Sequence, residues 1–273
     1  MKLINLIAGQ KRNLLSNLNS ILNCQNEKLK NFNFFVFWES DSLNNKEISI
    51  IKKKIKNSYF VTIKNNSYRK KIIKLLKNKI YPKNVKEQII RAYLQYSILQ
   101  YGYKYACKSL KKNYKNSYWQ RIRPDNYIEK KIPTLKKKNI LLLPGTIHGY
   151  GIIDYHCLGS FNVFKIYANL IDTLTDLYKL NIFVPPEIAL RMHLTKYKTN
   201  AILTEKLPAA LLENSNNISL RVNYARTRGN KYLGNHFSQN IIEKDFKFKN
   251  FYLFRKIYYY CYDILIRIKI KFS

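Results

Sequence analysis

The sequence predicts an α/β fold with a mostly parallel central sheet and helices on both faces. Three short apolar segments indicate buried parallel strands, at Leu3–Ala8, Phe34–Trp38 and Tyr59–Ile63. The segments between them are long enough for helices, and a strand-helix-strand-helix-strand order favours right-handed crossovers. A chain of 273 residues, 46% of them hydrophobic, can bury a sizeable core. One main domain over residues 1–245 is therefore expected.

The first strand leads into a turn that could bind an anion. Gly9 follows the strand, and we expect a helix from there to about Leu22 whose first turn carries Gln10, Lys11 and Arg12. Free N–H groups and the helix dipole would then face the carboxyl edge of the sheet. A tight connection between strand and helix would give the same pattern without any ligand.

Two further helices are expected at residues 46–56 and 68–80, before a much longer one. Apolar residues recur at steps of three and four from Val85 to Leu110, which predicts one helix of about seven turns. The tyrosines of this stripe are expected to pack in the core. The helix leads into a strand at Trp119–Arg123, which Pro124 ends.

The strand ending at Pro124 presents charged groups at its carboxyl end. Ligands of open α/β sheets bind at that edge. Alternation puts Arg121 and Arg123 on one face of the strand, where two guanidinium groups could hold a diphosphate. Asp125 follows the strand and could bind a divalent cation. An edge strand with solvated arginines and a turn aspartate remains the alternative interpretation.

The second half of the chain contains a glycine-rich stretch between a short strand at Ile140–Leu143 and a helix at residues 163–180 capped by Asn162. His148, Asp154 and His156 lie in this stretch and could form a metal cluster. Alternatively, Asp154 precedes a strand that enters the core. A helix from about Pro186 to Tyr197 would place Glu187 at its positive end. Strands at 201–204 and 218–222 would close the sheet.

Residues 246–273 alternate aromatic and cationic side chains, which predicts a basic C-terminal helix. Such a helix could lie on an anionic membrane surface or pack on the domain with its lysines reaching solvent. No apolar run approaches the length of about 20 residues that spans a bilayer. Four widely spaced cysteines favour reduced thiols. We therefore expect a cytoplasmic protein, with a peripheral location on the inner face of the cytoplasmic membrane as a further option.

The net charge of +34 favours polyanionic partners, although a bias towards Lys, Asn, Ile and Tyr also accounts for part of it. The basic residues are spread along the whole chain, and no recognisable RNA- or DNA-binding signature is present. These features argue against nucleic acid, which stays open as an alternative partner.

Four motifs follow one another between residues 3 and 194: Ala8-Gly-Gln-Lys-Arg12, Arg121-Ile-Arg-Pro-Asp125, Gly151-Ile-Ile-Asp154 and Pro186-Glu187. Together they resemble a group of bacterial and viral glycosyltransferases of the GT-A kind that act in surface-polysaccharide synthesis, lipopolysaccharide included. The resemblance implies a GT-A-like, Rossmann-like fold that uses a nucleotide-diphospho-sugar donor and a cell-surface glycan or lipid-linked acceptor. It also implies that Asp125 stands where these enzymes place a carboxylate that binds Mn²⁺ or Mg²⁺. The usual Asp-x-Asp motif is missing, which puts metal dependence in doubt.

These residues predict a division of roles. The turn with Gly9, Gln10 and Arg12 would hold the nucleotide, and Arg121 and Arg123 would neutralise the leaving diphosphate. A base is needed near the acceptor hydroxyl, and Asp154 and Glu187 are the first candidates, followed by His148. For Glu187 a simple role as a helix N-terminal charge is the alternative. A transferase-like scaffold without catalysis is the alternative for the whole chain.

Overall fold

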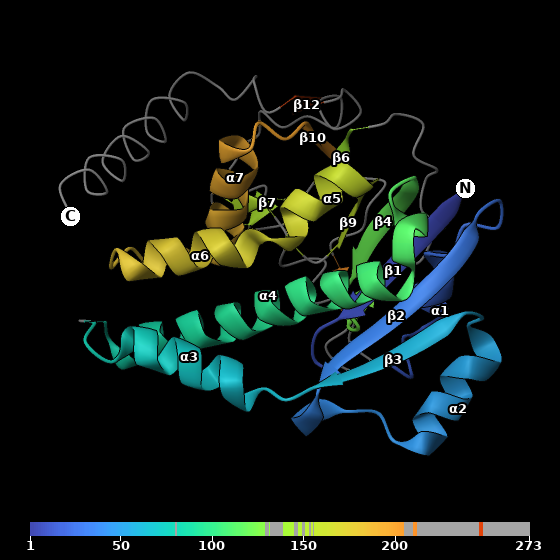
Figure 1. Cartoon of the computed structure of the whole chain (residues 1–273), viewed down its shortest axis with the longest axis horizontal. Coiled ribbons are helices and arrows are strands. Elements are labelled where there is room, and N and C mark those ends of the chain that lie inside the picture. The colour runs from blue at the N-terminus through green and yellow to red at the C-terminus, as the bar shows by residue number, and fades with distance from the viewer. Residues whose placement is uncertain are drawn as a thin grey trace.

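The computed structural model describes residues 1–79, 81–128, 131, 139–144, 147–148, 151–152, 154, 156–204, 210–211 and 246–247. Within these ranges the chain forms the α/β fold that the sequence predicted (Figure 1). The strands of the main sheet are β1 (Lys2–Ala8), β2 (Lys30–Trp38), β3 (Ser58–Ile63), β4 (Ser117–Ile122), β6 (Leu141–Pro144), β9 (His156–Ser160), β10 (Ala201–Thr204) and β12 (Phe246–Lys247). The α-helices are α1 (Leu18–Asn23), α2 (Asn45–Lys54), α3 (Asn66–Leu76), α4 (Lys83–Ser109), α5 (Phe161–Ala168), α6 (Leu170–Lys179) and α7 (Pro186–Lys196).

The main sheet is mixed but mostly parallel, in the order β12-β10-β6-β9-β4-β1-β2-β3. The block β4-β1-β2-β3 is parallel throughout, and β6 and β10 form a second parallel pair. The antiparallel strand β9 joins the two blocks. Two short pairs lie outside this sheet: β5 (Asn126–Tyr127) with β11 (Ala210–Leu211), and β7 (Ile147–His148) with β8 (Gly151–Ile152).

Helices cover both faces of the sheet, and consecutive residues of β1, β2 and β4 are accordingly buried whichever face they point to. On one face α3 to α7 pack against side chains such as Leu6 and Trp119. On the other face α1 and α2 pack against Ile7 and Phe35. The long helix α4 runs across the first face (Figure 1). None of the helices in the described ranges is both long and apolar enough to cross a membrane.

A row of side-chain amides crosses three neighbouring strands inside the core. Asn5 of β1 is paired in register with Asn33 of β2 and Gln120 of β4. The Asn5 amide donates to Asn33 Oδ1 at 2.8 Å, and Gln120 donates to Asn5 Oδ1 at 3.0 Å. All three side chains are fully buried. We call this row the amide ladder.

Two predicted helices were wrong in extent. The expected helix between Gly9 and Leu22 is a series of turns followed by the short α1, because Arg12 has a φ of 33°, outside the range of a right-handed helix. The expected helix at 163–180 is two helices that meet at Asn169, and Ser160 rather than Asn162 stands at the N-cap of α5. The expected strand at 218–222 lies outside the described residues. So does the C-terminal helix, apart from residues 246–247, which form β12.

Candidate functional site

The turn after β1 packs directly on the segment that follows β4. Gly9 has a φ of +150°, and a Cβ at this position would lie 3.2 Å from Cδ of Pro124. Only glycine adopts this backbone conformation readily, so a glycine is needed where the two segments meet. The Lys11 backbone N–H donates to the carboxylate of Asp41, which stands just after β2. The turn is thus held from both neighbouring strands.

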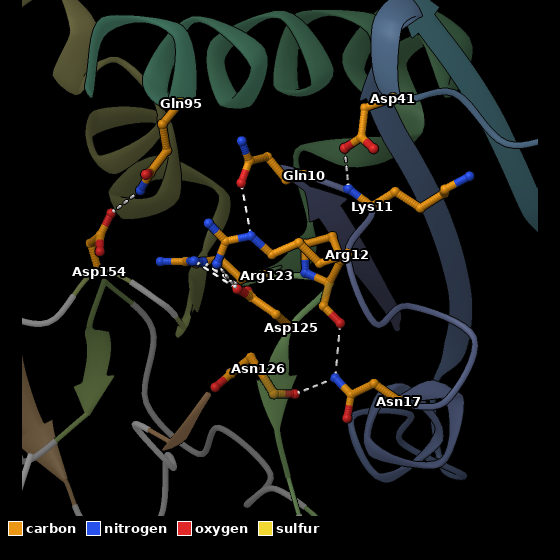
Figure 2. A network of polar contacts seen from close by, with 11 residues as sticks. Gln10, Lys11, Arg12, Asn17, Asp41, Gln95, Arg123, Asp125, Asn126 and Asp154 are labelled. Atoms are coloured by element: carbon orange, nitrogen blue, oxygen red, sulfur yellow. Dashed lines mark hydrogen bonds and ion pairs between the residues drawn. The ribbon is translucent and has the colours of Figure 1, made fainter. Parts of the chain in front are cut away.

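Arg12, Arg123 and Asp125 form one polar cluster at the carboxyl ends of β1 and β4 (Figure 2). Arg12 Nη1 donates to Asp125 Oδ2 at 2.7 Å, and Arg123 Nη2 donates to the same oxygen at 2.9 Å. Arg123 Nε donates to Asp125 Oδ1 at 3.0 Å. Gln10 Oε1 accepts from Arg12 Nε at 2.8 Å, which orients that guanidinium. The structure thus brings four of the residues that the sequence singled out to one place.

The exposure of the cluster differs sharply among its members. The Asp125 side chain is 2% exposed, that of Arg123 is 15% exposed, and that of Arg12 is 45% exposed. Arg12 therefore stands between the buried carboxylate and solvent. Asn17 fixes the base of the cluster, since its amide donates to the backbone oxygens of Pro124 and Asn126 at 2.9 and 2.7 Å. An anion that approaches from solvent would meet Arg12 first.

Arg121 lies apart from this cluster, on the face of the sheet covered by α4, and is fully buried. Its Nη1 lies 3.0 Å from Asp154 Oδ2 and donates to the backbone oxygen of Asp154 at 2.7 Å. It also donates to the Tyr167 hydroxyl at 2.9 Å. The predicted pair of diphosphate ligands is thus divided: Arg123 joins Arg12 at the edge, whereas Arg121 holds the segment before β9.

Asp154 is also buried, and its carboxylate accepts from two residues of α4. Gln95 Nε2 donates to Oδ2 at 2.7 Å, and the Tyr96 hydroxyl donates to the same oxygen. Burial acts to raise the Asp154 pKa, but the charges of Arg121 and Arg123 and the hydrogen bonds from Tyr96 and Arg121 outweigh it and hold the pKa below its usual value. The carboxylate is therefore stabilised in its charged form, which favours an ion-pair role over proton abstraction.

Glu187 lies in the first turn of α7, as the sequence predicted, and is only partly exposed. Burial, followed by the negative charge of Asp154, raises its pKa to about 7, although the charge of Arg123 opposes the rise. A carboxyl group with a pKa near 7 exchanges a proton readily at neutral pH, which is the property of a general base. His148 lies in β7, and its side chain falls outside the described part of the structure.

A divalent cation fits poorly at Asp125 in this arrangement. Both oxygens of this carboxylate accept hydrogen bonds from guanidinium groups, and two positive charges adjoin it. Mg²⁺ and Mn²⁺ need oxygen ligands, and among the described residues no group of three His, Cys, Asp or Glu side chains could hold a metal. The predicted metal role of Asp125 stays a prediction.

His156 belongs to the core rather than to the edge. It lies in β9, is fully buried, and burial lowers its pKa to about 3, so the ring is neutral. Its Nδ1 lies 3.3 Å from the amide nitrogen of Asn126. Of the two interpretations of this stretch, a strand that enters the core is the one that the structure supports for His156.

Sequence reasoning missed the side chains that position Asp154. Gln95 and Tyr96 of α4 and Tyr167 of α5 all contact the buried ion pair, although they come from different elements than its two members. The tyrosine stripe of α4 was expected to pack in the core, and Tyr96 does so while also donating a hydrogen bond. The one signal available was Gln95, a polar residue directly before an apolar position of that stripe.

No protein-family model and no curated protein sequence matches this chain. Among solved structures, the apo form of mouse xyloside xylosyltransferase 1 is similar to it with a TM-score of 0.40 and 9% sequence identity, over 74% of this chain and 84% of that one. A galactosyltransferase, LgtC, in complex with donor and acceptor sugar analogs is similar with a TM-score of 0.39 and 8% identity, over 71% of this chain and 70% of that one.

Proposed function

We propose that this protein is a glycosyltransferase that moves a sugar from a nucleotide-diphosphate donor to a cell-surface glycan or lipid-linked acceptor. The observation that carries the proposal is the cluster of Arg12 and Arg123 at the carboxyl edge of a mostly parallel sheet, with a glycine-dependent turn beside it. Ligands of such sheets bind at this edge. Two guanidinium groups there match the charge and the bidentate geometry of a diphosphate.

In this proposal Asp125 keeps both guanidinium groups in place before the donor binds. Arg12 is the more exposed of the two, so it is the group that can turn from Asp125 to a phosphate oxygen. Arg123 would remain on Asp125 and face the same phosphates. As the bond between sugar and phosphate breaks, negative charge accumulates on the diphosphate, and the two cations would stabilise it. Arg121 would act indirectly, through Asp154.

Glu187 is the better of the two predicted bases. Its pKa of about 7 lets it accept the proton of the acceptor hydroxyl at neutral pH. Asp154 carries a lowered pKa and is bound by Arg121, Gln95 and Tyr96, so we propose that it positions the segment before β9. We also propose that the enzyme works in the cytoplasm, where nucleotide sugars are available, and the lipid-linked acceptor would bring it to the inner face of the membrane.

A thermal-shift titration tests this proposal. UDP, GDP, CDP and dTDP are added to the purified protein with and without Mn²⁺, because a ligand that binds only the folded state raises stability by RT ln(1 + [L]/Kd). One nucleotide should raise the midpoint in the wild type and much less in Arg12→Ala. Arg91→Ala is the matched control, since Arg91 is 82% exposed on α4 and outside the site.

Comparing the titrations with and without Mn²⁺ tests whether nucleotide binding requires a metal at Asp125. A shift that requires Mn²⁺ and disappears in Asp125→Ala would support the metal role. A shift with the nucleotide alone would support the arginine pair. If no nucleotide shifts a protein that is shown to be folded, the transferase proposal is wrong, and a non-catalytic scaffold becomes the better description.

A further inference from the structure

The helix α3 carries a strongly basic outer surface next to the edge strand β3. Between Glu47 and Glu87 the sequence contains no Asp or Glu, but twelve lysines and Arg69. Five of these cations lie on or directly after α3 and are exposed: Arg69, Lys70, Lys71, Lys74 and Lys77. With Ile73 they make up what we call the α3 surface. Nothing in this stretch offers a compensating negative charge.

The α3 surface also has an apolar centre. Ile72 and Leu76 point into the core, whereas Ile73 is 48% exposed. On a helix the neighbours of Ile73 lie three and four residues away, and these include Arg69, Lys70 and Lys77. A single exposed isoleucine is ordinary on a protein surface. An isoleucine ringed by cations, however, has the composition of a helix that rests at the boundary between lipid headgroups and acyl chains.

The position of α3 relates this surface to the proposed site. Helix α3 begins at Asn66, three residues after the carboxyl end of β3. Because β3, β2, β1 and β4 are parallel neighbours, this end of β3 lies at the same edge of the sheet as Arg12 and Arg123. Figure 1 shows α3 directly beyond β3 on the side covered by α4. A membrane that contacts α3 would therefore lie at the edge where the site opens.

We propose that the α3 surface binds a lipid bilayer with anionic headgroups. Charge complementarity gives the attraction, since each lysine or arginine near an anionic bilayer strengthens binding about fivefold. The surface is rich in lysine, a point charge that suits a diffuse layer of headgroups. Sequence-reading surfaces on nucleic acid instead favour the bidentate fork of arginine, and Arg69 is the one arginine in the whole acid-free stretch.

The test is co-flotation of the full-length protein with vesicles of phosphatidylcholine alone or mixed with phosphatidylglycerol. The variant Lys70→Glu/Lys74→Glu/Lys77→Glu should bind the mixed vesicles at least about 100-fold more weakly than the wild type. The control Lys104→Glu/Lys108→Glu/Lys115→Glu makes the same change of charge at exposed positions, starting about 30 Å along α4 from its first residue. It should lose much less binding. Ile73→Ser should weaken binding to the mixed vesicles without changing its dependence on salt.

Three outcomes would overturn the proposal. The first is equal binding of the wild type to both kinds of vesicle, and the second is equal loss in the α3 variant and the control. The third is an α3 variant that still binds vesicles but no longer binds a fluorescent oligonucleotide, which would assign the surface to nucleic acid. Vesicle binding does not require the transferase reaction. A failure of vesicle binding would therefore leave the nucleotide-induced thermal shift of the wild type, and its loss in Arg12→Ala, unchanged. The two proposals can fail separately.

Discussion

Asp154→Asn separates a structural from a catalytic role for the buried ion pair. The substitution keeps the shape of the side chain but leaves the fully buried Arg121 guanidinium without its counter-charge. Removing one partner of a buried ion pair costs about 3–5 kcal/mol. A loss of this size is a large part of the total stability of an ordinary domain. We therefore expect the urea midpoint of Asp154→Asn to fall markedly at pH 7.

The matched control is Asp176→Asn. Asp176 lies 3.5 Å from Lys179 in an exposed pair on α6, so its loss should change stability by less than about 1 kcal/mol. A double-mutant cycle with Arg121→Met then measures the interaction free energy between Arg121 and Asp154. Since Met is apolar and leaves no buried charge, Arg121→Met/Asp154→Asn should be less destabilised than the sum of the single variants.

The effect of Asp154→Asn should also depend on pH. Because the Asp154 pKa is lowered in the folded protein, its contribution to stability is present above the unfolded value of about 4 and is lost as the pH falls through the folded value. The difference between wild type and variant should thus shrink in acid. A variant that unfolds at the wild-type urea concentration yet has lost all turnover would refute the positioning role and make Asp154 the base.

Three further substitutions test other parts of the structure. Glu187→Gln should abolish the rise of the transfer rate through about pH 7. It should also raise the thermal midpoint more at pH 8 than at pH 5. The reason is that ionising a carboxyl with a raised pKa costs stability as the pH increases from about 4 to about 7. A rate profile unchanged in shape would remove Glu187 as the base. Gly9→Ala should cost about 1–3 kcal/mol in urea unfolding and weaken nucleotide binding, since φ is +150° and the new Cβ would press on Pro124; unchanged binding would contradict a role for the turn. Gly102→Ala should cost about 1–3 kcal/mol with binding unchanged, because its Cβ would lie 2.9 Å from Val36 Cγ2, where α4 packs on the sheet; wild-type stability would show that the helix shifts freely.

Much of the sheet was predictable because several of its parallel strands contain runs of apolar residues. Buried parallel strands carry no polar face, so Phe34–Trp38 could be recognised without any knowledge of its neighbours. The 3.6-residue periodicity located α4 in the same way. The turn after Gly9 was harder, because it packs on distant segments: Gly9 lies against Pro124, and the Lys11 N–H donates to Asp41 just before Arg12 takes its positive φ. The order of apolar and polar residues near the turn does not reveal contacts with segments so distant along the chain.

The candidate site was predictable only in part, for a geometric reason. Arg12, Arg123 and Asp125 follow two strands that lie side by side, so their meeting follows from topology alone. Alternation also placed Arg121 and Arg123 on one face of a strand. The strand ends at Ile122, however, so that alternation does not continue to Arg123. The antiparallel course of β9 then brings Asp154 to Arg121, and no motif indicated that reversal.

The amide ladder restricts how the centre of the sheet can assemble. The hydrogen bonds from Asn5 to Asn33 and from Gln120 to Asn5 form in the observed register, in which the three residues lie side by side. If β1 slipped by two residues so that Asn5 faced Phe35 and Ile122, its apolar face would still point to the same side, but Asn33 and Gln120 would each face Leu3 instead of an amide. Every buried polar group left without a partner costs about 1–3 kcal/mol. The row of amides therefore favours the observed strand register during folding over a shifted register that hydrophobic contacts alone would also allow.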